Sequence, residues 1–266
     1  MIRDITLGQY YQSDSVIHRL DPRTKLIVTM VFLVSLFMVD SLWVFAIPFI
    51  LLFIEIKVSK VPFGFILKGM KAILMLLVIT VIFNVIFTPG DILFTIWRIS
   101  ITRQGIEIAV QMAIRLILLI MGSTMLTLTT TPTQLTDGLE SVMRPLTYIR
   151  VPVHEISMMM SIALRFIPIL LEETDKIIKA QLARGADFES KNIVKKVKSY
   201  IPILVPLFIS AFRRAGDLAL AMEARCYRVG ANRTKMKPLI YKRRDVVMYF
   251  ILTIYLGAII TITYVI

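Results

Sequence analysis

The chain has 266 residues, and 57% of them are hydrophobic, a share well above the roughly 45–50% that is typical of soluble domains. The mean hydropathy of +0.76 excludes a soluble fold and predicts an integral membrane protein. The net charge of +13 does not indicate nucleic-acid binding, because lysine and arginine concentrate in segments that a membrane topology would place in the cytoplasm.

Residues that could hold a metal, a cofactor or a nucleotide are not found in the sequence. The single cysteine, Cys226, excludes an internal disulfide bond, and His18 and His154 do not have the spacing of metal ligands. There is no glycine-rich phosphate loop and no nucleophile next to a base, so a membrane enzyme is a weaker alternative. We therefore expect this chain to bind no cofactor itself.

The first 21 residues contain no apolar run, so no cleavable signal peptide is expected. Asp21 is placed to cap a helix that begins at Pro22, which needs no amide donor there. Arg23 and Lys25 then fall at the level of the lipid headgroups. Two interpretations remain open for these residues: a helix cap with snorkelling cations, or a role in holding a cytoplasmic assembly together.

Four membrane spans are predicted before residue 130, at 26–39, 42–56, 72–88 and 106–128. The first two should form a tight hairpin, because one helix through both would exceed the ~30 Å membrane core and would place Asp40 inside it. The lysines within 57–71 mark a cytoplasmic loop. Residues 92–103 alternate loosely and should form an external hairpin or lie in the interface.

The fourth span carries a polar stripe at positions i, i+4 and i+8, formed by Glu107, Gln111 and Arg115. We expect this stripe to face the interior of the bundle, because ionisable groups in lipid are costly. It is either a structural seam or a substrate path, and the lack of other buried charges in the first three spans favours the seam. A substrate path would make the chain a secondary transporter, but the paired broken helices of such proteins are not found.

Three helices that are not membrane spans follow. Thr131 and Gln134 form a predicted capping box that opens a short amphipathic helix. Two long helices come next, at 154–183 and 199–224, joined by a basic link of lysines, and a last span covers 246–266.

The expected domains are 1–130 with four spans, 131–241 in the cytoplasm, and 242–266 with the fifth span. The N-terminus of this cell-membrane protein then lies inside and its C-terminus outside, since the basic clusters fall inside. The predicted fold class is all-α, with about five membrane helices and three amphipathic helices.

Both long helices end in the same motif, Ala-x-x-Ala-Arg followed by a small residue. A cation in the last turn of a helix is favoured by the helix dipole, and Gly185 can supply a left-handed cap. Helix capping alone would accept lysine, asparagine or histidine equally well. The repetition of Arg184 and Arg225 therefore favours two docking points for a partner.

The segment from Ser15 to Leu26, with His18-Arg19-Leu20-Asp21-Pro22-Arg23-x-Lys25, resembles the N-terminal signature of the transmembrane subunit of energy-coupling factor (ECF) transporters, the EcfT or CbiQ-like family. The resemblance continues through Leu128-Thr129-Thr130-Thr131-Pro132 and Leu164-Arg165-Phe166-Ile167-Pro168, and it ends with the two arginine motifs. It covers nearly the whole chain. The signature residues in this chain are His18, Asp21, Pro22, Arg23 and Lys25.

The resemblance implies a subunit that binds no vitamin or ATP. It implies two cytoplasmic ABC ATPases as partners, which bind ATP, and a membrane-embedded substrate-binding S-component for a vitamin or other micronutrient. The motifs that would sit in grooves on the ATPases are Ala183, Arg184, Gly185, Ala224, Arg225 and Cys226. The apolar first halves of the long helices would offer an adaptable platform for several interchangeable S-components, formed by Met158, Met159, Ala163, Phe166, Leu207, Phe208 and Ala211.

Overall fold

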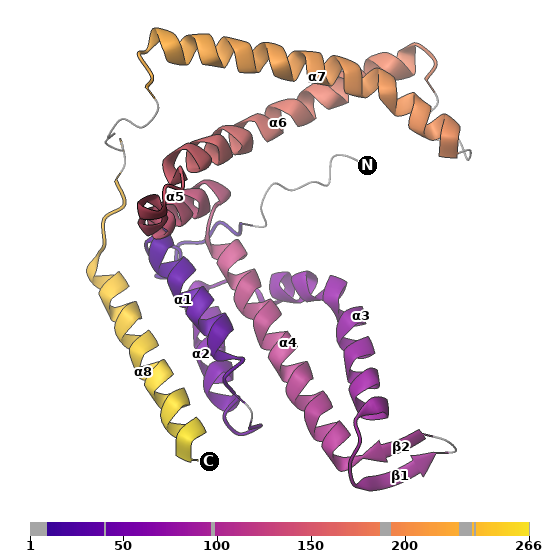
Figure 1. Cartoon of the computed structure of the whole chain (residues 1–266), viewed down its shortest axis with the longest axis vertical. Coiled ribbons are helices and arrows are strands. Elements are labelled where there is room, and N and C mark those ends of the chain that lie inside the picture. Colours follow the sequence, from indigo (N-terminus) through magenta and orange to yellow (C-terminus); the bar gives the residue numbers. More distant parts are fainter. Residues whose placement is uncertain are drawn as a thin grey trace. The chain divides into compact units, whose positions relative to one another are not determined.

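The computed structural model describes residues 10–39, 41–96, 99–186, 193–228, 236 and 238–265. These residues form eight α-helices, one 3₁₀ helix and one two-stranded hairpin (Figure 1), and the predicted all-α membrane fold class is confirmed. They divide into two compact units. We call Gly8–Val142 with Leu239–Ile266 the membrane unit, and Met143–Pro238 the helix-pair unit.

The membrane unit contains six helices and the hairpin, in chain order α1 (Pro22–Ser35), α2 (Ala46–Ser59), α3 (Phe63–Phe87), β1 (Ile92–Ile96), β2 (Ile99–Thr102), α4 (Arg103–Thr129), α5 (Pro132–Met143) and α8 (Arg243–Val265). The strands are antiparallel, with Ile92 opposite Thr102 and Ile96 opposite Ile99. Of the two expectations for this segment, a hairpin is therefore the one that is confirmed.

The core of the membrane unit lies where α1, α2, α4 and α8 meet. Leu36, Leu118, Met125 and Ile259 are all almost completely buried there. Gly122 lets α4 approach α1, because a Cβ atom at this position would lie 2.8 Å from Cε1 of Phe32. Small residues allow such close packing of helices in membranes, where van der Waals contact drives association.

Two predicted connections are shorter in the structure than the sequence suggested. Within 57–71 only residues 60–62 lie between helices, because α2 continues to Ser59, Lys60 turns the chain with φ of 57°, and α3 begins at Phe63. Part of the predicted basic link is helical as well, since α7 begins at Ile193. Lysine is a good helix former, so a lysine cluster by itself is weak evidence for a loop.

The start of α5 follows the predicted capping box. The amide of Thr131 donates to Oε1 of Gln134 at 3.3 Å, and the amide of Gln134 donates to Oγ1 of Thr131 at 3.3 Å. Pro132 is the first helical residue. Compactness places α5 with the membrane unit, whereas the sequence grouped it with residues 131–241, and those topological boundaries stay a prediction.

Within the described residues, three helices are long and apolar enough to cross a membrane: Arg103–Thr129, Val153–Ala183 and Arg243–Thr263. The first and third coincide with predicted spans. The second is the first of the two long helices, which the sequence placed outside the membrane. α1 and α2 have 14 residues each, which gives about 21 Å at ~1.5 Å per residue. The five-span count therefore stays a prediction.

The helix-pair unit consists of the 3₁₀ helix η1 (Arg144–Ile149) and two long helices, α6 (Val153–Ala183) and α7 (Ile193–Ala224). Glu173 pairs with Arg214 at 2.9 Å, and Nε2 of Gln181 donates to the carbonyl of Pro202 at 3.4 Å. The earlier of the two α6 residues, Glu173, contacts the later of the two α7 residues, Arg214. The two helices are therefore antiparallel. Figure 1 shows them as two long rods.

Candidate functional site: two arginine tips and a polar anchor

The end of α6 has a fixed backbone geometry. Arg184 takes the C-cap position. The amide of Ala186 donates to the carbonyl of Gln181 at 3.0 Å, and the amide of Gly185 donates to the carbonyl of Leu182 at 3.0 Å. This pair of bonds is a Schellman motif, and it requires a left-handed residue after the cap. Gly185 supplies that conformation with φ of 85°.

The end of α7 repeats this geometry. The amide of Tyr227 donates to the carbonyl of Met222 at 3.0 Å, and the amide of Cys226 donates to that of Glu223 at 2.8 Å. Cys226 occupies the left-handed position with φ of 55°, directly after Arg225. The sequence treated Cys226 only as a small residue. The structure shows that backbone conformation is the requirement here, and a non-glycine residue meets it at a cost of roughly 1–2 kcal/mol.

We call the two helix ends the arginine tips. Their six residues are all exposed, and they are Ala183, Arg184, Gly185, Ala224, Arg225 and Cys226. Because α6 and α7 are antiparallel and have 31 and 32 residues, the tips lie at opposite ends of the helix pair. At ~1.5 Å per residue each helix is about 45–48 Å long. The two guanidinium groups are therefore presented to solvent on separate, self-capped helix ends.

The predicted platform residues divide between two faces of the helix pair. Phe166 and Ala211 line a groove of about 320 Å³ between α6 and α7, and Met158 and Leu207 are half-buried. The other three are exposed, and they are Met159, Ala163 and Phe208.

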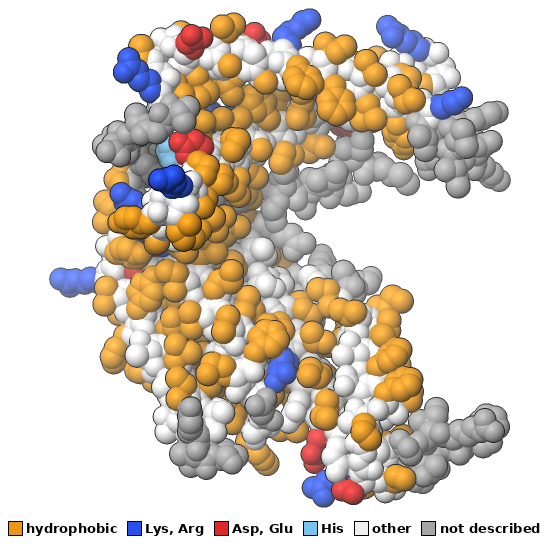
Figure 2. Space-filling model, in the orientation of Figure 1, with side chains coloured by type: hydrophobic (Ala, Val, Ile, Leu, Met, Phe, Trp, Pro, Cys, Tyr) orange, Lys and Arg blue, Asp and Glu red, His pale blue; other side chains and the backbone are white. Residues whose placement is uncertain are grey.

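The outward face of α7 is also apolar. Its exposed side chains recur at helical spacing and include Ile201, Leu204, Val205, Phe208 and Phe212. Figure 2 shows hydrophobic side chains along the visible length of α7. One apolar face of α7 thus meets α6, and another has no cover within the described residues.

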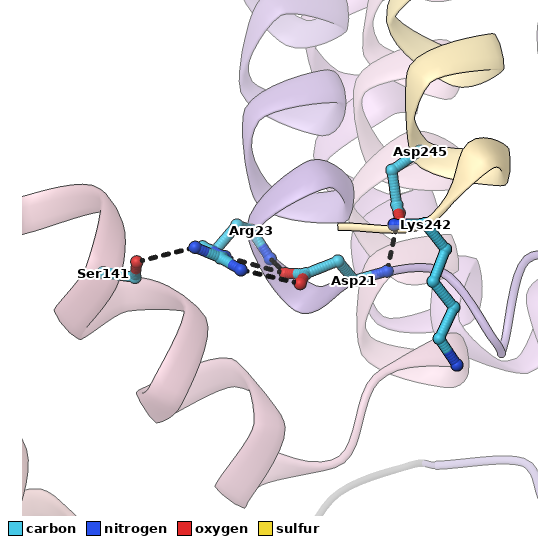
Figure 3. A network of polar contacts seen from close by, with 5 residues as sticks. All are labelled: Asp21, Arg23, Ser141, Lys242 and Asp245. Carbon is cyan, nitrogen blue, oxygen red and sulfur yellow. Dashed lines mark hydrogen bonds and ion pairs between the residues drawn. The ribbon is translucent and has the colours of Figure 1, made fainter. Parts of the chain in front are cut away.

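The N-terminal signature forms a second charged cluster, in the membrane unit (Figure 3). Asp21 is the N-cap of α1, as predicted, and its carboxylate accepts from the amide of Arg23 at 2.9 Å. The guanidinium of Arg23 also pairs with Asp21 at 3.0 Å, reaches Ser141 of α5 at 3.4 Å and stacks on Tyr241, 4.1 Å from the ring centroid. These contacts join the start of α1 to α5 and to the segment before α8.

Asp245 closes this cluster from α8. Its carboxylate accepts from the amide of Asp21 at 2.8 Å and from the amide of Lys242 at 2.7 Å. Only 1% of Asp245 is exposed. A carboxylate in the first turn of a helix is favoured by the helix dipole and can bond back to the N-cap amide. One side chain therefore completes the starts of two helices that lie 224 positions apart in sequence.

Lys25 does not snorkel to the headgroups, and that expectation is wrong. It is 5% exposed, and its Nζ donates to the carbonyls of Thr129 at 2.8 Å and His18 at 3.1 Å. The carbonyl of Thr129 belongs to the last turn of α4, where backbone acceptors lack partners within the helix. Lys25 satisfies that acceptor. We call Asp21, Arg23, Lys25, Ser141 and Asp245 the polar anchor.

His18 lies beside the polar anchor, and each of its ring nitrogens is within hydrogen-bond distance of a partner. Its Nε2 lies 3.0 Å from the carbonyl of Tyr11, and its Nδ1 lies 2.7 Å from Oγ of Ser15. A carbonyl only accepts, so in the neutral ring Nε2 carries the proton and Nδ1 accepts from the serine hydroxyl. Desolvation lowers the pKa of His18, against the opposing effect of the hydrogen bond to Tyr11. His18 and Pro22, the first residue of α1, complete the signature.

Sequence reasoning missed Asp245, Ser141 and Tyr241. The only local signal was for Asp245, an acidic residue three positions after Lys242 at the start of the last span. That spacing matches the second half of a capping box, but lysine is an unusual N-cap. Ser141 and Tyr241 carry no local signal, because their contacts with Arg23 depend on the tertiary fold.

The contacts of the polar stripe of α4 differ along its length. Nη2 of Arg115 donates to the carbonyl of Val39 at 2.6 Å and lies near the rings of Phe37 and Phe45, so it ties α4 to the α1–α2 connection. Glu107 is exposed and pairs with Arg103 of its own helix at 3.3 Å. Gln111 is half-buried between these two levels. This arrangement matches a structural seam at Arg115 and gives no support to a substrate path.

Comparison with known proteins agrees with the resemblance that the sequence suggested. The model of the cobalt transport protein (CbiQ) family matches residues 13–236. The energy-coupling factor transporter transmembrane protein EcfT of Ruminiclostridium cellulolyticum is 50% identical over 265 residues, which cover 100% of this chain and 99% of that protein. The proteins of the same name from Clostridium kluyveri and Bacillus subtilis are 53% and 43% identical, over 92% of this chain and over 92% and 93% of their own lengths.

The match to the Ruminiclostridium cellulolyticum protein spans both units of this chain, and the family model covers both arginine tips but ends before α8. Identity near one half over almost the full length of both chains leaves no segment of the fold outside the comparison. This chain belongs to the CbiQ family, as a transmembrane component of the energy-coupling factor transporter type.

Proposed function

We propose that this chain is the non-catalytic coupling subunit of an ECF-type importer. It joins two cytoplasmic ATPase subunits, which bind ATP, to a membrane-embedded S-component, which binds a vitamin or other micronutrient. The chain itself binds no cofactor. The membrane unit fixes the subunit in the cell membrane, and the helix pair transmits ATPase motion to the S-component. In this arrangement residues 131–241 and the N-terminus lie in the cytoplasm, and the C-terminus lies outside.

The observation that carries this proposal is the pair of matching arginine tips. Each tip completes its backbone hydrogen bonds within its own helix end, so the arginine side chain is not needed to finish the helix. Each arginine is exposed, and the two tips lie at opposite ends of an antiparallel pair. Such a geometry fits one ATPase at each end.

Arginine suits this role because its planar guanidinium can bind a carboxylate with two parallel hydrogen bonds. Removing one member of a desolvated charge pair at an interface costs about 2–5 kcal/mol, whereas an exposed surface pair contributes about 0–1 kcal/mol. The size of the defect therefore distinguishes docking from helix capping. A loss of about 2–5 kcal/mol of binding free energy on removal of either arginine supports ATPase docking at the tips.

The exposed apolar face of α7, together with Met159 and Ala163 on α6, is the proposed platform for the S-component. Methionine and unpartnered aliphatic side chains adapt to partners of different shape. The polar anchor holds the ends of α1, α4, α5 and α8 together, and it provides a fixed base within the membrane unit.

The proposal is tested by purifying the whole transporter with Arg184→Ala, Arg225→Ala or both, and measuring how much of each ATPase remains bound. Each single variant should lose affinity for one ATPase by about 30-fold or more, which corresponds to about 2 kcal/mol. The double variant should lose both ATPases and should not transport. Lysine at either position should restore binding only in part, because it keeps the charge but loses the two-pronged geometry.

The matched control is Arg150→Ala, which removes another exposed arginine at a helix end, with φ of 64°. It should leave ATPase binding unchanged. If the double variant binds both ATPases and transports at the parental rate, the tips are helix caps only and the proposed coupling is wrong.

The alternative of a secondary transporter is not supported. It required the polar stripe of α4 to line a substrate path, but Arg115 bonds to the α1–α2 connection and Glu107 pairs on its own helix. The relatives are also components of a different transporter class.

A further inference from the structure

The membrane unit has a groove between α2 and α8 that no part of the proposed coupling mechanism uses. Its volume is about 640 Å³, within the roughly 300–1,000 Å³ of small-molecule sites. Its walls are almost entirely apolar, and they are formed by Ile47, Ile50 and Ile54 of α2 and by Val247, Ile251 and Ala258 of α8. Several of these side chains remain about half exposed, so the walls need an apolar occupant.

The mouth of the groove is basic. Arg243 and Arg244, at the start of α8, line it and are exposed. The hydrogen bond from Arg19 lowers the pKa of Asp14, and the positive charges of Lys60 and Arg244 lower it further. Lys60 and Arg244 are thus close enough to Asp14 for their charges to act on its carboxylate.

That carboxylate does not neutralise the mouth. Asp14 is already paired with Arg19, so the charges of Lys60, Arg243 and Arg244 remain. The neighbouring carboxylate of Asp245 is buried, and its two oxygens accept from the amides of Asp21 and Lys242.

We propose that this groove binds one anionic phospholipid, with its phosphate at Arg243 and Arg244 and an acyl chain along the α2 and α8 walls. Basic pockets between membrane helices bind anionic lipid headgroups in this way. The chemistry of the site matches both ends of such a molecule, because a positive mouth opens onto an apolar channel inside a membrane unit. A zwitterionic lipid would leave the excess positive charge at the mouth unmatched.

Glu55 is the acidic residue of the groove wall. It lines both this groove and a small adjoining space that is also lined by Lys25 and Thr129. The phosphate position lies towards the ends of the helices, because Val58 of α2 and Arg243 of α8 mark that end of the lining.

The proposal is tested in the whole transporter, reconstituted in phosphatidylcholine vesicles that contain increasing fractions of phosphatidylglycerol with brominated acyl chains. Bromine quenches tryptophan fluorescence at short range. Trp43 and Trp97 are replaced by phenylalanine, and a reporter is introduced by Ile251→Trp in the groove. A matched reporter, Leu76→Trp on the exposed face of α3, measures quenching by bulk lipid.

Quenching at the groove reporter should saturate at a low phosphatidylglycerol fraction, whereas quenching at the α3 reporter should rise in proportion to that fraction. Arg243→Gln with Arg244→Gln should raise the half-saturating fraction about 30-fold, since each basic residue near a membrane surface strengthens anionic lipid binding about fivefold. The control Lys57→Gln removes a cation from the same end of α2 that does not line the groove. It should leave the titration unchanged.

Three results would overturn the proposal. Equal saturable quenching by brominated phosphatidylcholine or phosphatidylethanolamine would show an apolar groove without headgroup selection. An unchanged titration in the double glutamine variant would remove the arginines from the site. Absence of quenching in the whole transporter, with quenching in the isolated chain, would show that a partner subunit covers the groove. Because the tips take no part in this assay, its outcome is independent of the proposed ATPase docking.

Discussion

The polar anchor and the arginine tips are both built from charged residues at helix ends, but they finish their helices in opposite ways. In the polar anchor, side chains from other helices complete the backbone: Asp245 accepts from the amide of Asp21, and Lys25 donates to the carbonyl of Thr129. At the tips the backbone completes itself through two Schellman motifs. Asp21, Lys25 and Asp245 of the anchor are buried, whereas Arg184 and Arg225 at the tips are exposed.

The contrast separates the role of the arginine motif at the tips from that of the N-terminal signature. A charged side chain that satisfies buried backbone groups is committed to its own fold, because its removal leaves those groups unsatisfied. A charged side chain on a self-capped helix end is available to a partner. We therefore expect changes in the polar anchor to affect stability, and changes in the tips to affect assembly.

The largest effect on stability is expected from Asp245→Ala. It leaves the amides of Asp21 and Lys242 without their charged acceptor in a buried site, which should cost about 3 kcal/mol. The melting temperature of the purified chain in detergent should fall by roughly 6–12 °C. Asp217→Ala, which removes an exposed carboxylate of α7, is the control and should change it little. Equal effects of the two variants would contradict the anchoring role of Asp245.

Substitutions at the left-handed residues of the tips should change stability less, and one should lower it while the other raises it. Gly185→Ala should destabilise the end of α6 by about 1–2 kcal/mol, because the left-handed conformation disfavours a Cβ atom. Cys226→Gly should stabilise the end of α7, by less than 1 kcal/mol, because the greater freedom of glycine in the unfolded chain offsets part of the gain.

Amide hydrogen exchange of residues 182–186 and 222–227 measures both changes. Exchange should become about fivefold to 30-fold faster in Gly185→Ala and slower in Cys226→Gly. Cys226→Ser keeps a Cβ atom at the same φ and serves as the control. Slower exchange in Gly185→Ala would show that these helix ends do not depend on the left-handed residue.

The smallest effect is expected from pH. Because the pKa of His18 is lowered in the folded chain from its usual 6.5, the unfolded chain binds protons more readily as the pH falls below about 6.5. The contribution of His18 to stability is therefore complete above that pH and is lost as the pH falls towards the lower, folded pKa. The melting temperature should fall between pH 7.5 and pH 5.5, and it should fall less in His18→Gln than in the parent. His154→Gln removes the other imidazole, and an equal reduction there would contradict the role of His18.

The features that were predicted correctly depend on local signals. The cap at Asp21, the capping box at Thr131, and the ends of α6 and α7 each follow from residues within one or two helical turns. The apolar runs of α4 and α8 likewise located two helices that are long and apolar enough to cross a membrane. Such signals act between neighbours in the chain, so one sequence contains them in full.

The features that were missed depend on contacts between distant segments. The bond between Asp21 and Asp245 spans 224 positions and that between Lys25 and Thr129 spans 104, so neither leaves a local pattern. Lys25 was assigned to the headgroups because an isolated lysine at a helix start usually reaches water. The position of Cys226 was interpreted by size, because φ is not visible in a sequence.

Photo-cross-linking in the intact transporter tests the docking of the two tips most directly. A photo-reactive amino acid replaces Leu182, beside Arg184, or Glu223, beside Arg225, and a third probe replaces Met159 on the platform. If each tip docks on one ATPase, position 182 should give an adduct with one ATPase, position 223 an adduct with the other, and position 159 an adduct with the S-component. ATPase adducts from position 159, together with only lipid or S-component adducts from positions 182 and 223, would contradict this docking.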